Sequence, residues 1–152
     1  MQFNPAGEVS LPMKPTTYML DTDMFSYLVS GRHPHVRAMA AEREKSIVLS
    51  SVTLAESLFG ARKRGSEKLF SIIGLFRDMF PIVNWTSEAA MAYADIRLSL
   101  EQQGIPIGGM DMMIAASALS GGYVLVTNNV RHFGRISGLA IENWLDEAPQ
   151  GQ

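Results

Sequence analysis

Short apolar runs separated by longer amphipathic stretches make up most of the chain. Residues 18–20, 47–49 and 123–126 are apolar runs with the length and composition of buried strands. Residues 81–85 are predicted to form another strand, and residues 139–141 a last strand at the edge of the sheet. Between these strands, apolar residues recur at helical spacing, and capping residues, prolines or glycines mark where helices begin and end.

Six helices and one helical turn are predicted between the strands. The helices span residues 24–29, 34–44, about 54–64, 67–79, Thr86 or Ser87 to about Gln103, and 111–119, and the turn contains Phe133. The segment 111–119 is apolar nearly all round, so it is predicted to be a buried helix. Strands that alternate with helices indicate an α/β fold, with a mostly parallel sheet covered by helices on both faces.

Length and composition agree with one globular domain. A chain of 152 residues can bury roughly two thirds of its unfolded surface around a single core. We assign the domain to residues 17–146, with a disordered extension at 1–16 and a flexible tail at 147–152. The extension does not resemble a signal peptide, and no apolar run approaches the roughly 20 residues of a membrane helix. A cytoplasmic protein without a membrane partner is therefore expected.

Charge and cysteine content limit the chemistry further. The formal net charge is -2 and the sequence pI is about 5.9, so the overall field does not attract a polyanion. A nucleic acid would have to be held by local basic residues or by a metal ion. The sequence has no cysteine, which excludes disulfides, thiolate nucleophiles and cysteine-ligated zinc.

Polar oxygen ligands occur where predicted strands end or predicted helices begin. Asp21 follows the first strand, Asn129 follows the strand 123–126, and Asp111 precedes the apolar helix. The carboxyl ends of parallel strands meet at one edge of the sheet, so we expect these side chains to converge there. If Glu56 joins them, three carboxylates and a carboxamide can hold a hard divalent cation, for which oxygen ligands favour magnesium or manganese over zinc.

Helix capping is the competing interpretation for each of these acids. Asp21 or Asp23 can cap the helix that follows the first strand. Residues 53–56 fit a Thr-x-x-Glu capping box, and Asp111 can cap the apolar helix. The number of acids at such junctions favours a site, because carboxylates brought together repel one another unless a cation neutralises them.

Basic and imidazole side chains give weaker signals. His33, His35 and His132 are scattered, and we do not expect a catalytic base among them. Arg131, His132 and Arg135 follow the strand that leads to Asn129, so they have a better claim to contacts with a phosphate backbone, and the two arginines are the candidates we assign.

Four blocks of sequence resemble PIN-domain ribonucleases, in particular the toxin subunits of VapBC-type toxin and antitoxin pairs. The blocks are MLDTD at residues 19–23, SSVTLAESLFG at 50–60, GIPIGGMDMMIAA at 104–116 and VTNNVRHF at 126–133. They occur in the order and spacing of that family, and the resemblance extends from Met19 to about Trp144.

The resemblance implies a compact three-layer α/β/α domain, magnesium- or manganese-dependent cleavage of RNA, an antitoxin that blocks the acidic site, and a homodimer. By this resemblance Asp21, Glu56 and Asp111 coordinate the metal ion. The family's fourth acid falls at Asn129, where this chain has an amide. Thr22 and Thr127 are expected to support the ligands through their hydroxyl groups. Asp23 is interpreted as the helix cap.

The main hypothesis is therefore a metal-dependent endoribonuclease that acts as the toxin of a toxin–antitoxin pair, with an RNA substrate such as tRNA. The alternative is a PIN-fold module that binds RNA or protein without turnover, because the fourth acid is missing. A nucleotide-binding or receiver-like domain is disfavoured, since no glycine-rich phosphate loop follows the first strand.

Overall fold

The structure is a computed structural model that describes residues 2–3, 9–10 and 14–145. At the start of the chain, β1 (Gln2–Phe3) and β2 (Val9–Ser10) pair in antiparallel register. The disordered extension predicted for residues 1–16 did not include this pairing. Its residues 1, 4–8 and 11–13 lie outside the described part of the chain, as does the tail predicted for 147–152.

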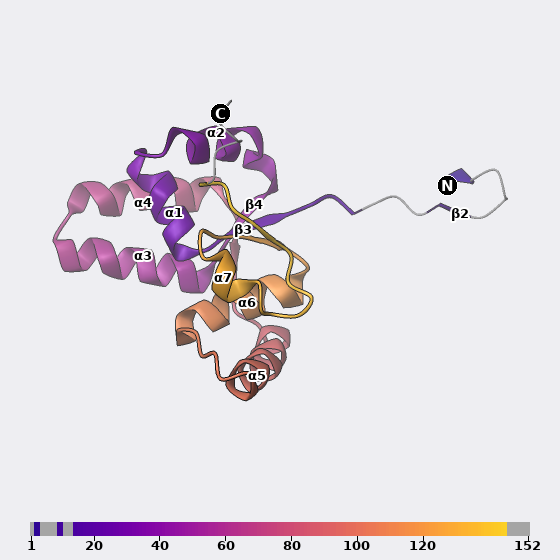
Figure 1. Cartoon of the computed structure of the whole chain (residues 1–152). Coiled ribbons are helices and arrows are strands. Elements are labelled where there is room, and N and C mark those ends of the chain that lie inside the picture. The colour runs from indigo at the N-terminus through magenta and orange to yellow at the C-terminus, as the bar shows by residue number, and fades with distance from the viewer. Residues whose placement is uncertain (1, 4–8, 11–13, 146–152) are drawn as a thin grey trace, which may run out of the picture.

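Five parallel strands form the central sheet (Figure 1). They are β3 (Tyr18–Leu20), β4 (Ile47–Ser50), β5 (Ile82–Val83), β6 (Val124–Val126) and β7 (Ile141–Glu142), in the order β5-β4-β3-β6-β7. Leu20 pairs with Leu49 on one side and with Val126 on the other. The strand order reverses at β3, and open α/β sheets bind ligands outside the carboxyl ends of the strands at such a reversal.

Alternate residues of the inner strands feed two separate cores. Met19, Val48 and Leu125 lie in one core. Leu20, Leu49 and Val126 lie in the other. Successive side chains of a strand point to opposite faces, so an apolar run of three residues can supply both cores. The sheet is therefore the middle layer of a three-layer fold, as the sequence predicted.

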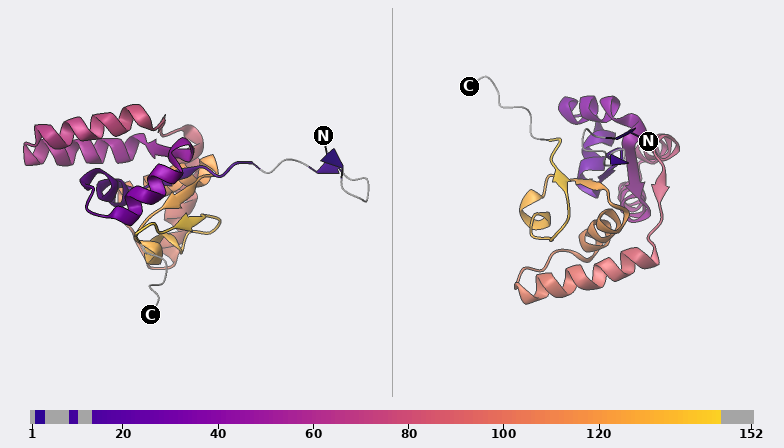
Figure 2. Two further views of the ribbon diagram at one scale, coloured as in Figure 1. Left: turned by 90° about the horizontal axis from the view of Figure 1, so that it is seen from above. Right: turned by 90° about the vertical axis from the view of Figure 1, so that its right-hand side faces the viewer.

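Helices cover both faces of the sheet. One face is covered by α1 (Thr22–Ser30), α2 (Pro34–Glu42), α3 (Ser51–Arg64) and α4 (Glu67–Met79), and the other by α5 (Ser87–Gln102), α6 (Gly109–Gly121) and the short α7 (Val130–Phe133). In Figure 2, α3 and α4 form a pair that projects from the sheet. Helix α5 packs against α6. Within the described residues, no helix is long and apolar enough to cross a membrane.

The start of α3 differs from the prediction, and the difference removes the proposed capping box. The helix begins at Ser51, three residues before the predicted start, because the Ser50 hydroxyl accepts a 3.1 Å hydrogen bond from the Val52 amide. Thr53 is instead fully buried inside the first turn, and its hydroxyl donates to the Leu20 carbonyl at 3.5 Å. Glu56 is therefore not the partner of a capping threonine.

Other helix and strand boundaries differ from the predicted ones by smaller amounts. Helix α6 begins at Gly109 with Gly108 as its N-cap, so Asp111 lies in the first turn and is not the cap. Helix α2 ends at Glu42, and a 3-10 helix at Glu44–Ser46 leads into β4. The edge strand β7 lies at Ile141–Glu142, displaced by about two residues from the prediction. Helix α4 coincides with the predicted segment 67–79.

The cap of α3 predicts a measurable stability change. Ser50→Ala leaves the buried Val52 amide without its side-chain acceptor and should lower the free energy of unfolding by about 1 kcal/mol in urea denaturation. Ser51→Ala, one residue further on, removes no capping bond and serves as the control. Equal effects of the two substitutions would contradict the assigned cap.

Candidate active site

Four elements bring the predicted site residues to the carboxyl edge of the sheet. Asp21 follows β3 directly, and Asn129 lies three residues beyond β6. Helix α3, which follows β4, carries Glu56 on its second turn, and Asp111 lies in the first turn of α6. These positions surround the point where the strand order reverses.

Asp21 is the most enclosed of the acids, with 4% of its surface exposed. Its amide donates to the Val126 carbonyl at 3.0 Å, and its Oδ1 accepts from the Met24 amide at 2.8 Å. Burial raises the pKa of Asp21 to about 6, although hydrogen bonds from the Thr127 hydroxyl and the Met24 amide oppose the rise. The nearby charges of Asp23 and Asp111 raise the pKa further.

The N-cap of α1 is Asp21, so the prediction that Asp23 caps this helix is wrong. Asp23 lies in the first turn with an exposed side chain. Asp21 caps the helix through Oδ1, which leaves its second carboxylate oxygen for another contact. Capping and ligation are therefore compatible in the same carboxylate.

Glu56 is held by a hydroxyl group from the neighbouring helix. The Thr22 hydroxyl donates to Glu56 Oε1 at 2.6 Å, across two elements that are far apart in sequence. The Glu56 carboxylate is half-buried, and this contact orients it at the start of α1. The Thr22 hydroxyl thus fixes the orientation of the Glu56 carboxylate.

Asp111 is close enough to the other acids for their charges to affect it. Burial is the main cause of its raised pKa, followed by the charges of Glu56 and Asp23. His132 has the opposite influence and lowers the pKa of Asp111. An imidazole therefore lies beside the acids, in the segment after β6 that the sequence offered for phosphate contacts.

Asn129 is fixed by two hydrogen bonds near the end of β6. Its backbone amide donates to the Thr127 hydroxyl oxygen at 2.9 Å, and its side-chain Nδ2 lies 2.9 Å from His132 Nδ1. Thr127 is fully buried, so one hydroxyl connects the backbone of Asn129 to the carboxylate of Asp21. His132 is three residues from Asn129, a spacing that places two side chains on one face of a helix.

The two predicted phosphate contacts occupy different places. Arg131 is exposed on α7, next to His132. Arg135 lines a separate cleft with Asp95 of α5 and Leu119 of α6. Leu119 is eight residues after Asp111, or roughly 12 Å along a helix. Arg135 thus lines a cleft separate from the acids, whereas Arg131 lies two residues beyond Asn129.

The acids fit a hard divalent cation in charge and in ligand type. In the described part of the chain, the ion pairs are Arg43–Glu42, Arg77–Asp78 and Arg97–Glu101, so no lysine or arginine neutralises the site. As the side chains stand, no three acids or histidines among the described residues are close enough to hold one ion. Coordination of one ion by Asp21, Glu56 and Asp111 would therefore require their carboxylates to move closer together.

A cleft of about 260 Å³ opens beside the acids, between α1, α3 and α4. Thr22, Asp23 and Glu56 line part of it. Apolar side chains, including Phe25 and Ile73, line another part together with Arg64. The cleft thus joins an acidic surface to an apolar one.

Comparison with protein families identifies the family to which this fold belongs. The family model described as PIN domain matches residues 18–139, which contain all four predicted site residues. The chain belongs to the PIN-domain family. Within that family it is similar to VapC ribonucleases, as the sequence resemblance predicted.

The relatives are similar over nearly their whole length. The tRNA(fMet)-specific endonuclease VapC of Salmonella typhimurium is 34% identical over 128 residues, which cover 84% of this chain and 97% of the relative. Ribonuclease VapC2 of Rickettsia felis is 34% identical over 131 residues, with the same two coverages. These names are those of nucleases, so the PIN-domain module without turnover is not favoured.

Solved structures of the family have the same fold. The DNA-bound VapBC structure from Salmonella typhimurium has a TM-score of 0.80 and 34% identity, and covers 86% of this chain and 99% of that one. VapBC2 from Rickettsia felis, bound to a DNA fragment of its promoter, has a TM-score of 0.80 and 32% identity, with coverages of 85% and 99%. The present PIN domain therefore has the VapC architecture.

Burial of Asp21 predicts how stability depends on pH in the metal-free protein. The folded protein binds the Asp21 proton more tightly than the unfolded chain does, so the free energy of unfolding should fall as the pH rises from 3.8 to about 6. Asp21→Asn keeps a capping oxygen without the charge. It should raise the free energy of unfolding at neutral pH by up to about 3 kcal/mol.

Urea denaturation at several pH values in the presence of EDTA measures this effect. Asp95→Asn, an exposed position on α5, is the matched control and should change stability by less than about 0.5 kcal/mol. A wild-type stability that rises over this pH interval, or an Asp21→Asn variant less stable than wild type at neutral pH, would contradict the assignment.

Proposed function

We propose that this protein is a metal-dependent endoribonuclease that acts as the toxin of a toxin–antitoxin pair. The observation that carries the proposal is the buried carboxylate of Asp21 at the reversal of strand order, close to Asp111 and not paired with any lysine or arginine of the described residues. The VapC relatives named as ribonucleases or as a tRNA endonuclease support the reaction and suggest tRNA as the substrate class.

In this proposal, Asp21, Glu56 and Asp111 hold Mg²⁺ or Mn²⁺. Such an ion, when bound, activates water and stabilises the negative charge that develops on a phosphodiester. The Thr127 hydroxyl keeps the Asp21 carboxylate in place, and the Thr22 hydroxyl keeps Glu56 in place. These bonds limit the freedom of the ligands, and ligand supports of this kind typically contribute about 10- to 100-fold in affinity or activity.

The amide at Asn129 limits the charge of the site to three carboxylates. An amide oxygen can ligate a cation or accept a hydrogen bond, but it neutralises no positive charge. We therefore propose one firmly held ion and a weaker second one. Asn129 orients a water molecule or the substrate.

The RNA is proposed to approach from the side of α7. Arg131 is exposed there, next to His132 and close to Asn129. A guanidinium group suits a phosphate oxygen because it donates several hydrogen bonds in a fixed plane. Arg135 lines the cleft against α5, so we propose that it contacts only a more distant part of the RNA.

An antitoxin is the proposed protein partner. The similar solved structures are described as VapBC complexes, and the cleft between α1, α3 and α4 offers apolar and charged side chains beside the acids. Most apolar residues of α6 lie in the core, although Met110 in its first turn is 52% exposed, so this helix offers little binding surface. On α4, Leu75 is 67% and Met79 50% exposed, so this helix can contribute to an interface with an antitoxin or with a second subunit of a homodimer.

Loss of one site carboxylate should abolish activity. Asp21→Asn and Asp111→Asn each remove a charge with little change in shape, and each should reduce magnesium-stimulated RNA cleavage at least about 100-fold and abolish growth inhibition. Cleavage of labelled tRNA and colony formation after induced expression measure the two effects. Asp95→Asn is again the control, and full activity of either site variant would refute the assignment.

Removal of the metal distinguishes the proposed nuclease from the alternative, a module that binds RNA without cleaving it. Purified protein with structured RNA and magnesium should give discrete products, and EDTA should stop their formation. A module without turnover would give a mobility shift without products. Cleavage that is unchanged in EDTA would contradict metal dependence.

A further inference from the structure

The side chain of Asn129 is held by an imidazole and not by the helix that it precedes. Asn129 is the N-cap residue of α7, but its side chain makes no capping hydrogen bond. Its Nδ2 instead lies 2.9 Å from His132 Nδ1. The backbone of Asn129 is fixed separately, because its amide donates to the Thr127 hydroxyl at 2.9 Å.

The chemistry of the two groups determines the direction of this bond. An amide nitrogen only donates, so Nδ1 of His132 must accept and the imidazole proton must be on Nε2. The two ends of the carboxamide lie on opposite sides of its carbon atom. With the nitrogen turned to His132, the Asn129 oxygen points away from the imidazole.

The orientation matters because Asn129 stands where the family has an acid. A carboxylate presents two equivalent oxygens, so either orientation places an acceptor toward the site. A carboxamide presents an acceptor in one orientation and a donor in the other. A protein with an amide at this position therefore needs a second group that selects the orientation.

His132 is suitably placed for this role. It is exposed, and within the described residues it belongs to neither of the two hydrophobic cores. His132 thus has no role in the core. It contacts the Asn129 side chain from α7, three residues further along the chain. Asn129 is the residue at which this site differs from the family pattern.

We propose that His132 is a positioning residue that turns the Asn129 carboxamide so that its oxygen, and not its nitrogen, serves the reaction. This proposal rests on the proposed nuclease function. His132 touches neither the substrate nor the cation in this role, and it acts only through Asn129.

A double-mutant cycle tests the proposal with tRNA cleavage in magnesium. His132→Ala in the wild-type background should lower kcat about tenfold with little change in KM, because substrate binding is not the function removed. His132→Gln restores an acceptor for the amide and should recover most of kcat. In the Asn129→Asp background, the carboxylate needs no orientation, so loss of the imidazole should cost less than about twofold.

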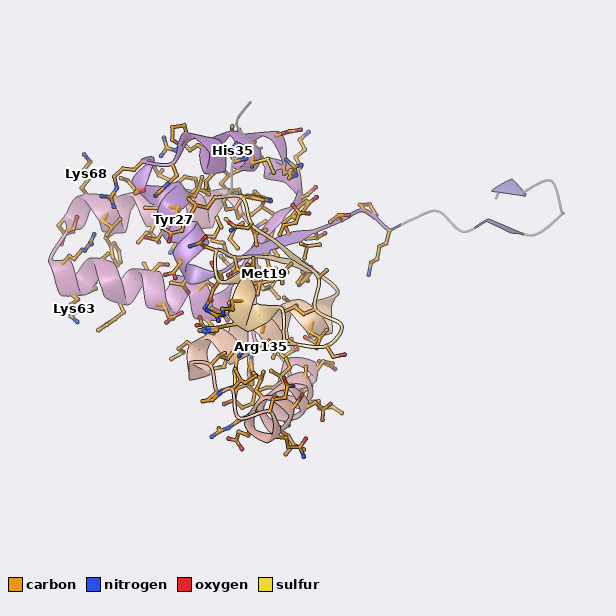
Figure 3. All side chains as sticks on the ribbon, viewed as in Figure 1. Met19, Tyr27, His35, Lys63, Lys68 and Arg135 are labelled. Carbon is orange, nitrogen blue, oxygen red and sulfur yellow. The ribbon has the colours of Figure 1, made fainter. Side chains whose placement is uncertain are left out.

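Two outcomes of the cycle would overturn the proposal. An equal loss in both backgrounds would mean that His132 acts independently of Asn129. No loss in the wild-type background would mean that the contact has no role. His35→Ala on α2, which Figure 3 shows far from Arg135 and α7, is the control for histidine removal and should leave kcat unchanged.

Proton–nitrogen correlation NMR tests the contact independently of activity. The side-chain amide signals of Asn129 are identified by their loss in Asn129→Asp. One of the two amide protons should be shifted downfield in the wild type, and His132→Ala should remove that shift. If the wild type cleaves no RNA, the nuclease function fails, while the NMR result still decides this contact: an amide pair that is insensitive to His132→Ala overturns it.

Discussion

The structure depends on one costly arrangement, the burial of the Asp21 carboxylate at the carboxyl end of β3. With 4% of its surface exposed, this residue connects β3 to β6 through the Val126 carbonyl and begins α1 through the Met24 amide. Burial disfavours the charged form, which is why the pKa of Asp21 rises to about 6. Around this fixed charge lie Asp111 and Asp23, which increase the cost instead of reducing it.

Helix capping and cation binding use the same location for a physical reason. In a parallel sheet the helix that follows a strand begins at the strand's carboxyl end, so its free amides and positive dipole end stabilise an acid there. Asp21 uses one oxygen for that purpose. Glu56 is not a capping residue; Thr22 holds it from the neighbouring helix at 2.6 Å. Asp21 and Glu56 are therefore oriented before any cation is present.

Much of the fold and of the acid set could be predicted from sequence, because both depend on local patterns. The segment 67–79 is an amphipathic helix with clear ends, and Asp21 and Asp111 mark junctions that a parallel sheet brings together. Where two neighbouring residues can both cap, as with Ser50 and Thr53, sequence alone does not decide. The contact between His132 and Asn129 depends on how the chain folds after β6, and the proposed antitoxin surface depends on a second chain.

Isothermal titration calorimetry of the RNA-free protein with Mn²⁺ or Mg²⁺ tests most directly whether the buried Asp21 carboxylate binds the cation. Saturable binding of one firmly held ion per chain is expected, together with release of protons near pH 6, because the ion displaces the proton held by Asp21. The proton release is measured from the dependence of the binding enthalpy on the buffer. Binding without proton release at that pH, or equal binding by Asp21→Asn, would contradict a cation site built on this carboxylate.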